Sequence, residues 1–144
     1  MKHRVIGIAV LLLTLLLAGC GAQKAPELQV LPDWDNNSIS ILAEKAGVGS
    51  MAGGATVTLA EGEALVVETA LTDASGLGLK LFRSVGEDDP NASVDEILHS
   101  DDTPALELTL SGTGVTEYPL EPGEYSLMVS VQARSTGTAS IYTR

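Results

Sequence analysis

The stretch Glu124-Tyr-Ser-Leu-Met-Val-Ser-Val131 repeats with a period of two, in which Tyr125, Leu127, Val129 and Val131 alternate with Ser126, Met128 and Ser130. Successive side chains of a β-strand point to opposite faces of its sheet. This stretch therefore predicts a strand with one face in a core and the other in solvent. Such one-sided alternation is typical of antiparallel sheets, because parallel sheets are usually buried on both faces.

The same period recurs along most of the chain. It runs through residues 55–59, 65–71, 77–82, 106–110 and 140–142, and turn residues separate these runs at 61–62, 75–76, 111–114, 122–123 and 136–137. We also expect a strand at 38–46, with a short helix as the alternative, a flexible loop at 47–54, and helical turns at 93–99, with a strand as the alternative. Short strands at this spacing predict an all-β fold, a single antiparallel β-sandwich of jelly-roll or Ig-like type.

The N-terminus has the form of an export signal. A basic start is followed by an uncharged apolar run that ends in Leu17-Ala-Gly-Cys20. This segment resembles the lipobox of bacterial lipoproteins, and the resemblance implies cleavage before Cys20 and a diacylglycerol on its sulfur. The alternative is an uncleaved membrane helix over 5–22.

The lipobox divides the chain into a signal peptide at 1–19, the lipidated Cys20 with a tether to residue 32, and a β-sandwich domain at 33–144. Loss of 19 of the 144 residues leaves 125, which is enough for one domain. We expect this domain on the extracytoplasmic face of the cell membrane, attached through lipid on Cys20.

Composition excludes several classes of function for the part after the signal. All 19 acidic residues and six of the eight basic ones lie beyond position 20, which gives a net charge of −13. That charge excludes a nucleic-acid partner. Cys20 is the only cysteine and His99 the only histidine after the signal, so thiol catalysis and multi-histidine metal sites are excluded as well. We predict no catalytic residue, no metal ligand and no cofactor.

Two acidic segments are nevertheless candidates for a metal site or a catalytic site. Asp33, Asp35, Asn37 and Glu44 have the spacing of calcium ligands in an EF-hand loop, although Ser38 replaces the usual glycine. A solvated acidic turn is the alternative. Residues 87–102 hold seven carboxylates and His99, which allow a hydrolase, but no spacing rule selects a catalytic pair.

The aromatic residues suggest one more site. Tyr125 alternates with core positions, so we expect it to pack in the interior. Trp34, Tyr118 and Tyr142 could form a platform for stacking sugars, or Trp34 could cover the open end of the sandwich.

The stretch Leu120-Glu-Pro-Gly-Glu-Tyr-Ser-Leu-Met-Val129 resembles a turn and strand found near the end of several bacterial β-sandwich modules, including pre-peptidase C-terminal-like domains. The whole chain resembles small exported β-sandwich lipoproteins. We expect a non-catalytic binding or envelope-accessory module with an envelope protein or glycan as partner. A carbohydrate- or calcium-binding module is the alternative, and a hydrolase that uses residues 87–102 is the third hypothesis.

Overall fold

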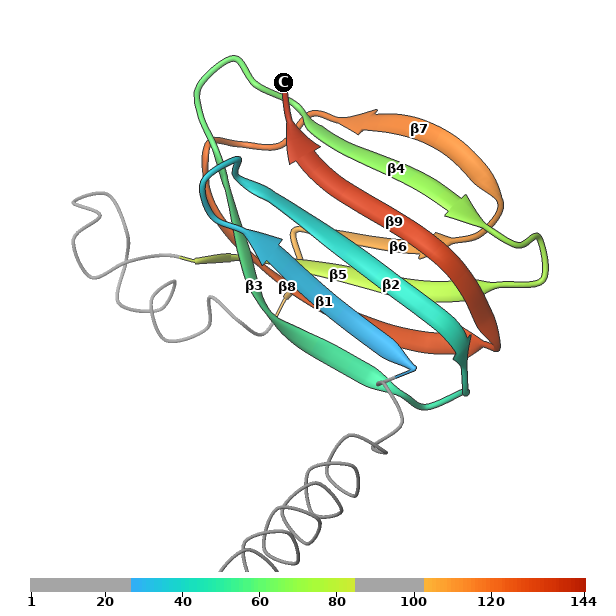
Figure 1. The fold of residues 1–144 in the computed structure, drawn as a ribbon. Helices are drawn as coiled ribbons and strands as arrows, with labels where there is room; N and C mark the ends of the chain where they lie inside the picture. The colour runs from blue at the N-terminus through green and yellow to red at the C-terminus, as the bar shows by residue number, and fades with distance from the viewer. Residues whose placement is uncertain (1–26, 85–102) are drawn as a thin grey trace, which may run out of the picture.

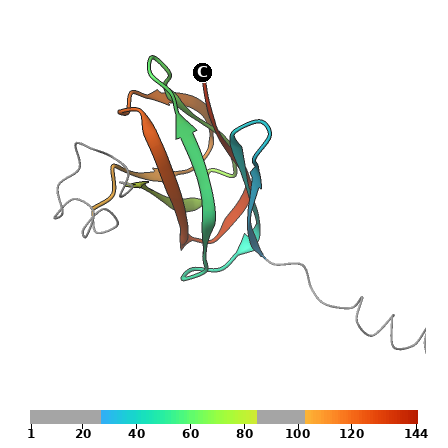
Figure 2. The same cartoon turned by 90° about the vertical axis from the view of Figure 1, so that its left-hand side faces the viewer.

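A computed structural model describes residues 27–84 and 103–144, and within them it contains nine strands in two antiparallel sheets (Figure 1). The strands are β1 (Leu28–Asp33), β2 (Ser38–Ala46), β3 (Met51–Leu59), β4 (Leu65–Leu71), β5 (Gly76–Ser84), β6 (Leu106–Leu110), β7 (Thr113–Tyr118), β8 (Gly123–Ala133) and β9 (Ser135–Thr143). The first sheet has the order β1-β2-β9-β4-β7 and the second has the order β3-β8-β5-β6. Figure 2 shows the two sheets facing each other, so the predicted sandwich is confirmed.

The strand order selects the jelly roll over the Ig-like fold. Among the described strands, only β1–β2 and β5–β6 are both consecutive in the chain and neighbours in a sheet, and every other connection crosses between the sheets. Without β1, the two sheets hold four strands each, in the orders β2-β9-β4-β7 and β3-β8-β5-β6. Eight strands divided in this way form the jelly roll.

The core lies between the sheets and uses the positions that alternation predicts. Leu77, Leu79 and Leu81 of β5 are fully buried, and Leu127 and Val129 of β8 are buried opposite them. Tyr125 is 1% exposed, which confirms its predicted packing role.

Four segments differ from the predictions. Residues 28–32 were assigned to the tether, but β1 pairs with β2 along its whole length, from Leu28 opposite Ala43 to Asp33 opposite Ser38. The expected loop at 47–54 is a turn at 47–50 followed by β3. The turn expected at 136–137 lies inside β9, and β7 occupies residues for which no strand was predicted. Of the two segments with alternatives, 38–46 is a strand, whereas 93–99 lies outside the described residues.

The strands run between two ends of the sandwich, which we name the entry end and the far end. The entry end, where β1 begins, carries the connections at 47–50, 72–75, 111–112 and 134 (Figure 1). The far end carries the connections at 34–37, 60–64 and 119–122, the end of β5, the start of β6 and Arg144. Within the part of the chain that is described, no helix is long and apolar enough to cross a membrane.

Candidate functional site

The β1–β2 turn at the far end presents an exposed tryptophan. Trp34 is 63% exposed, so it does not cover the end of the sandwich as one prediction held. Asn37 closes the turn in a left-handed conformation with φ of 50°, which asparagine tolerates better than most residues. Its Nδ2 donates to the carbonyl oxygen of Thr58 at 2.6 Å, and its Oδ1 accepts from the Thr58 N–H at 2.8 Å. The turn is therefore attached to the end of β3, and Trp34 is displayed on a fixed support.

Asp33 stabilises the same turn from its other side. Its Oδ2 accepts from Asn36 Nδ2 at 2.8 Å, and its Oδ1 accepts from the Asn36 N–H at 3.3 Å. These hydrogen bonds, the side-chain one first, hold the pKa of the Asp33 carboxyl below its ordinary value. The carboxylate is thus engaged by its own turn.

The structure does not bring the four calcium candidates together. Glu44 lies on β2, and at about 3.3 Å per residue it stands about 20 Å from the start of that strand at Ser38. The Oδ1 of Asn37 is directed to Thr58 rather than toward Asp33 and Asp35. Residues 27–84 and 103–144 contain no group of three or more carboxylates or histidines placed to hold a metal. The acidic turn that the sequence left as the alternative is the arrangement observed.

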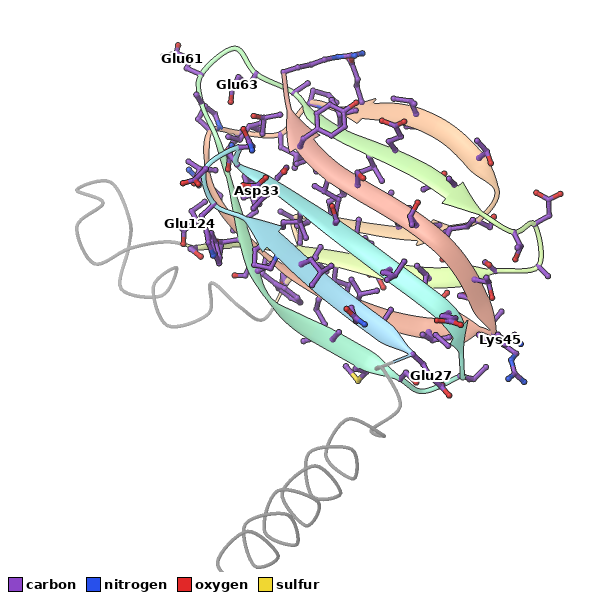
Figure 3. The ribbon with its side chains drawn as sticks, in the orientation of Figure 1. Glu27, Asp33, Lys45, Glu61, Glu63 and Glu124 are labelled. Atoms are coloured by element: carbon purple, nitrogen blue, oxygen red, sulfur yellow. The ribbon has the colours of Figure 1, made fainter. Side chains whose placement is uncertain are left out.

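Carboxylates nevertheless gather at the far end, and Figure 3 labels four of them, Asp33, Glu61, Glu63 and Glu124. Glu63 caps its own loop by accepting from the Ala60 N–H at 2.9 Å. The far-end acidic residues in the described part of the chain are Asp33, Asp35, Glu61, Glu63, Glu117, Glu121 and Glu124. Two cations lie at the same end: Arg83 is paired with Glu121 at 3.7 Å, and Arg144 is paired with Glu117. The surface around Trp34 is therefore strongly negative.

Tyr125 supports the 119–122 loop from the core. Its hydroxyl donates to the backbone carbonyl of Glu121, four residues upstream. Burial raises the pKa of this phenol, while the Arg83 cation opposes the change. Arg83 also donates to the carbonyl oxygen of Pro122 at 3.0 Å, so two side chains fix this loop.

The three aromatic residues proposed as a sugar platform do not form one. Tyr118 is paired with Leu65, and Tyr142 is paired with the next residue, Val66. Adjacent residues of a strand face opposite ways, so Tyr118 faces the interior of the sandwich and Tyr142 its outer surface. Trp34 lies on the β1–β2 turn.

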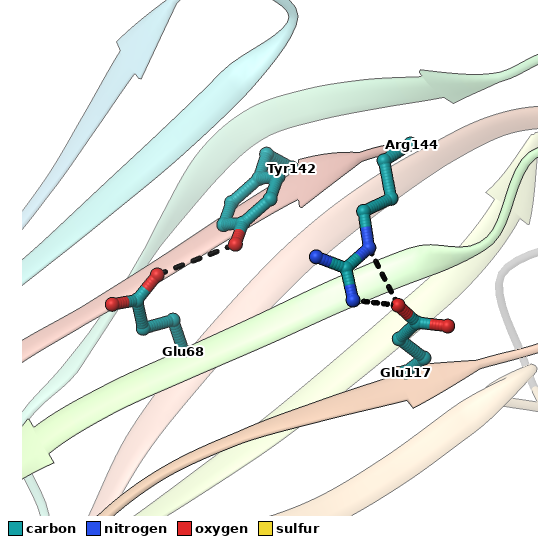
Figure 4. Close-up of polar contacts among 4 residues, drawn as sticks. All are labelled: Glu68, Glu117, Tyr142 and Arg144. Carbon is teal, nitrogen blue, oxygen red and sulfur yellow. Dashed lines mark hydrogen bonds and ion pairs between the residues drawn. The ribbon is translucent and has the colours of Figure 1, made fainter.

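Tyr142 has a structural role on the outer face of the first sheet. Its hydroxyl donates to Glu68 Oε2 at 3.3 Å, and beside it Arg144 Nε donates to Glu117 Oε1 at 2.5 Å (Figure 4). Val66 lies between Tyr142 and Glu117 in the register and is fully buried although it faces outward. We conclude that these polar side chains close over Val66.

A cleft of about 180 Å³ opens where the edge strands β6 and β7 separate. Buried Val67 and Leu110 provide apolar surface inside it, whereas hydroxyl groups dominate the remainder. The lining residues are Val67, Thr69, Thr109, Leu110, Ser111, Thr113, Gly114, Thr116 and Tyr118. The cleft was not expected from the sequence, because no strand was predicted at 113–118.

Other predicted sites lie outside the described residues. They are the lipidation site Cys20, the acidic segment 87–102 and His99 within it.

No family model matches the chain, and no curated protein is similar to it. Among solved structures, one similar chain comes from a study described as binding sub-site dissection of a family 6 carbohydrate-binding module. That chain is 12% identical, with a TM-score of 0.37, over 83% of this chain and 81% of its own length. The function proposed below therefore depends on the residues of this chain itself.

Proposed function

We propose that the protein is a non-catalytic binding module, held on the extracytoplasmic face of a membrane by lipid on Cys20, that binds its partner with the far end of the sandwich. One observation carries the proposal. Trp34 is 63% exposed on a turn that Asn37 fixes, at the end opposite to the point where the chain from Cys20 enters.

A fixed and exposed tryptophan is suited to binding. Tryptophan combines a large apolar ring with an N–H donor, and it is enriched among the residues that dominate interface energetics. Because the turn is already ordered, little conformational entropy is lost when Trp34 is buried by a partner. The surrounding carboxylates favour a partner with a basic rim around an apolar pocket. We propose an envelope protein as that partner.

The anchor suits this orientation. Glu27 is the seventh residue after Cys20, a span of at most about 25 Å when fully extended. Two acyl chains give stable attachment where one is marginal. An anchor at the entry end leaves the far end directed away from the lipid.

The anchor is tested by mass spectrometry and fatty-acid labelling of the native protein and of Cys20→Ala. We expect a diacylglycerol-modified Cys20 at the mature N-terminus and no label in the variant. A bare thiol with residues 1–19 still attached would refute the anchor.

The binding surface is tested with a photoreactive benzoylphenylalanine at position 34 in the native envelope. The matched control is the same group at Met128, which is 40% exposed on the outer face of the second sheet. We expect a discrete crosslinked product from position 34 alone. Equal products, or none, from both positions would refute the far end as the binding surface.

The cleft between β6 and β7 favours a second candidate function, the binding of a carbohydrate. Threonine hydroxyls such as those of Thr109 and Thr116 can hydrogen-bond to a sugar, and Tyr118 offers an aromatic side chain beside them. A glycan array tests this candidate, with Tyr118→Ala expected to lose any binding and Tyr142→Ala to keep it. Binding that both variants retain would place the sugar elsewhere.

A further inference from the structure

The connection at 47–50 displays two apolar side chains at the entry end. The Ser50 N–H donates to the carbonyl oxygen of Gly47 at 3.1 Å, and Gly49 has φ of 91°, which matches a type II turn with Val48 at its tip. Val48 is 71% exposed, and Met51, the first residue of β3, is 64% exposed. We name residues 47–51 the apolar turn.

The apolar turn is bonded to the segment through which the chain enters the domain. The Glu27 carbonyl oxygen accepts from the Glu44 N–H at 2.8 Å, and Glu27 Oε2 accepts from the Gly47 N–H at 3.3 Å. Because Cys20 lies only seven residues before Glu27, a lipid on its sulfur brings the bilayer surface to within about 25 Å of this point.

The charges of the entry end are nearly balanced. Lys45 and Arg134 are exposed there, and neither forms an ion pair within the described residues. The acidic groups at the same end are Glu27, Glu44 and Asp73. This balance contrasts with the strongly negative far end, so the entry end is the one that anionic headgroups repel least.

From these three features we infer that the apolar turn is a second membrane contact, which rests in the headgroup region of the bilayer to which Cys20 is anchored. Val48 and Met51 enter the boundary between headgroups and acyl chains, and the long side chains of Lys45 and Arg134 extend toward the phosphates. The inference rests on the proposed lipidation. It adds that the sandwich stands in one orientation, with Trp34 directed away from the membrane.

Single thiols test this contact in the lipidated full chain, since acylated Cys20 leaves no other cysteine. An environment-sensitive fluorophore is attached at Val48→Cys or Met51→Cys, with Trp34→Cys and Met128→Cys as controls. Each protein is placed in phosphatidylcholine vesicles that contain a lipid with a nitroxide near the headgroup. We expect blue-shifted emission and nitroxide quenching at 48 and 51, and neither effect at 34 or 128.

Quenching at 48 and 51 no greater than at the two control positions, in protein whose lipidated mass has been confirmed, would overturn the inference and leave the anchor standing. A blue shift without nitroxide quenching would mean that a second copy of the chain covers the turn, and it would also overturn the inference. A bare Cys20 would refute the proposed anchor and this inference with it. Trp34 is the only tryptophan, so its intrinsic fluorescence in the unsubstituted protein should also escape quenching.

Discussion

Replacement of Asn37 by alanine should destabilise the domain and loosen the turn that carries Trp34. The side chain of Asn37 makes two short hydrogen bonds to the backbone of Thr58. At about 0.5–1.5 kcal/mol net for each bond, their loss costs about 1–3 kcal/mol. The left-handed backbone adds about 1 kcal/mol for alanine, because asparagine tolerates this conformation better than alanine does. We expect Asn37→Ala to lower the free energy of unfolding by about 2–4 kcal/mol.

Two matched variants separate these contributions. Asn37→Gly also loses the hydrogen bonds but accepts the positive φ, so it should be about 1 kcal/mol more stable than Asn37→Ala. Asn37→Asp keeps an acceptor for the Thr58 N–H and places a negative charge against the Thr58 carbonyl, so it should fall below the wild type as well.

Urea denaturation followed by far-UV circular dichroism measures the global effect, and acrylamide quenching of Trp34 measures the local one. Greater quenching in Asn37→Ala under native conditions would show that the turn has loosened. An unfolding free energy within about 0.5 kcal/mol of the wild type, which is typical of a neutral surface substitution, would refute the role assigned to Asn37. Equal stability of the alanine and glycine variants would refute the contribution of the backbone conformation.

Three further changes have defined outcomes. Gly137→Ala should cost more than about 3 kcal/mol in thermal unfolding, because its Cβ would collide with a backbone carbonyl of β4, whereas Gly62→Ala, with open space and φ of 85°, should cost only about 1 kcal/mol. Tyr125→Phe should lose about 1–2 kcal/mol with its hydroxyl bond. Because burial raises the folded-state pKa of this phenol, wild-type stability should also fall as the pH rises above about 10, and the variant should lose that part of the dependence in pH-scanned melts. Asn36→Ala should raise the depressed pKa of Asp33 toward its ordinary value in an NMR titration. The wild type should lose part of its stability as the pH falls below about 4, and this variant should lack that pH dependence.

The sequence predicted the strands that bury one face fully in the core and missed two edge strands, β1 and β7, which contain no fully buried residue. Strands β5 and β8 alternate because their inner residues are buried between the sheets. In contrast, β7 is an edge strand with five exposed residues and one half-buried residue, so no alternation marked it. Similarly, β1 is half-buried at Leu28–Val30 and exposed beyond it, and Pro26 and Pro32 suggested a tether. Tertiary pairing, which composition does not reveal, places both strands in the sheet.

The role of Gly137 was predicted wrongly for a related reason. Gly137 was taken as a turn residue, because glycine usually marks positive φ in turns. Its φ is indeed positive, at 129°, but it lies inside β9, where a side chain would meet the carbonyl oxygen of Ala70 and the Cα of Leu71. The residue permits a close approach between β9 and β4. A sequence alone does not distinguish this need from that of a turn.

The calcium hypothesis failed for a reason that explains the site. An EF-hand loop and a tight turn can both be rich in Asp and Asn, because in the loop their oxygen atoms bind the ion and in the turn their side chains hydrogen-bond to nearby groups of the chain. In the calcium loop the oxygens converge on the ion, whereas here Asp33 accepts from Asn36 and Asn37 bonds to Thr58 on another strand. The course of the chain beyond the turn distinguishes the two arrangements. In a calcium loop the chain curls back around the ion, whereas here it continues as the extended strand β2. These hydrogen bonds engage the side-chain oxygen atoms that an ion would need, and they also stabilise the turn that exposes Trp34.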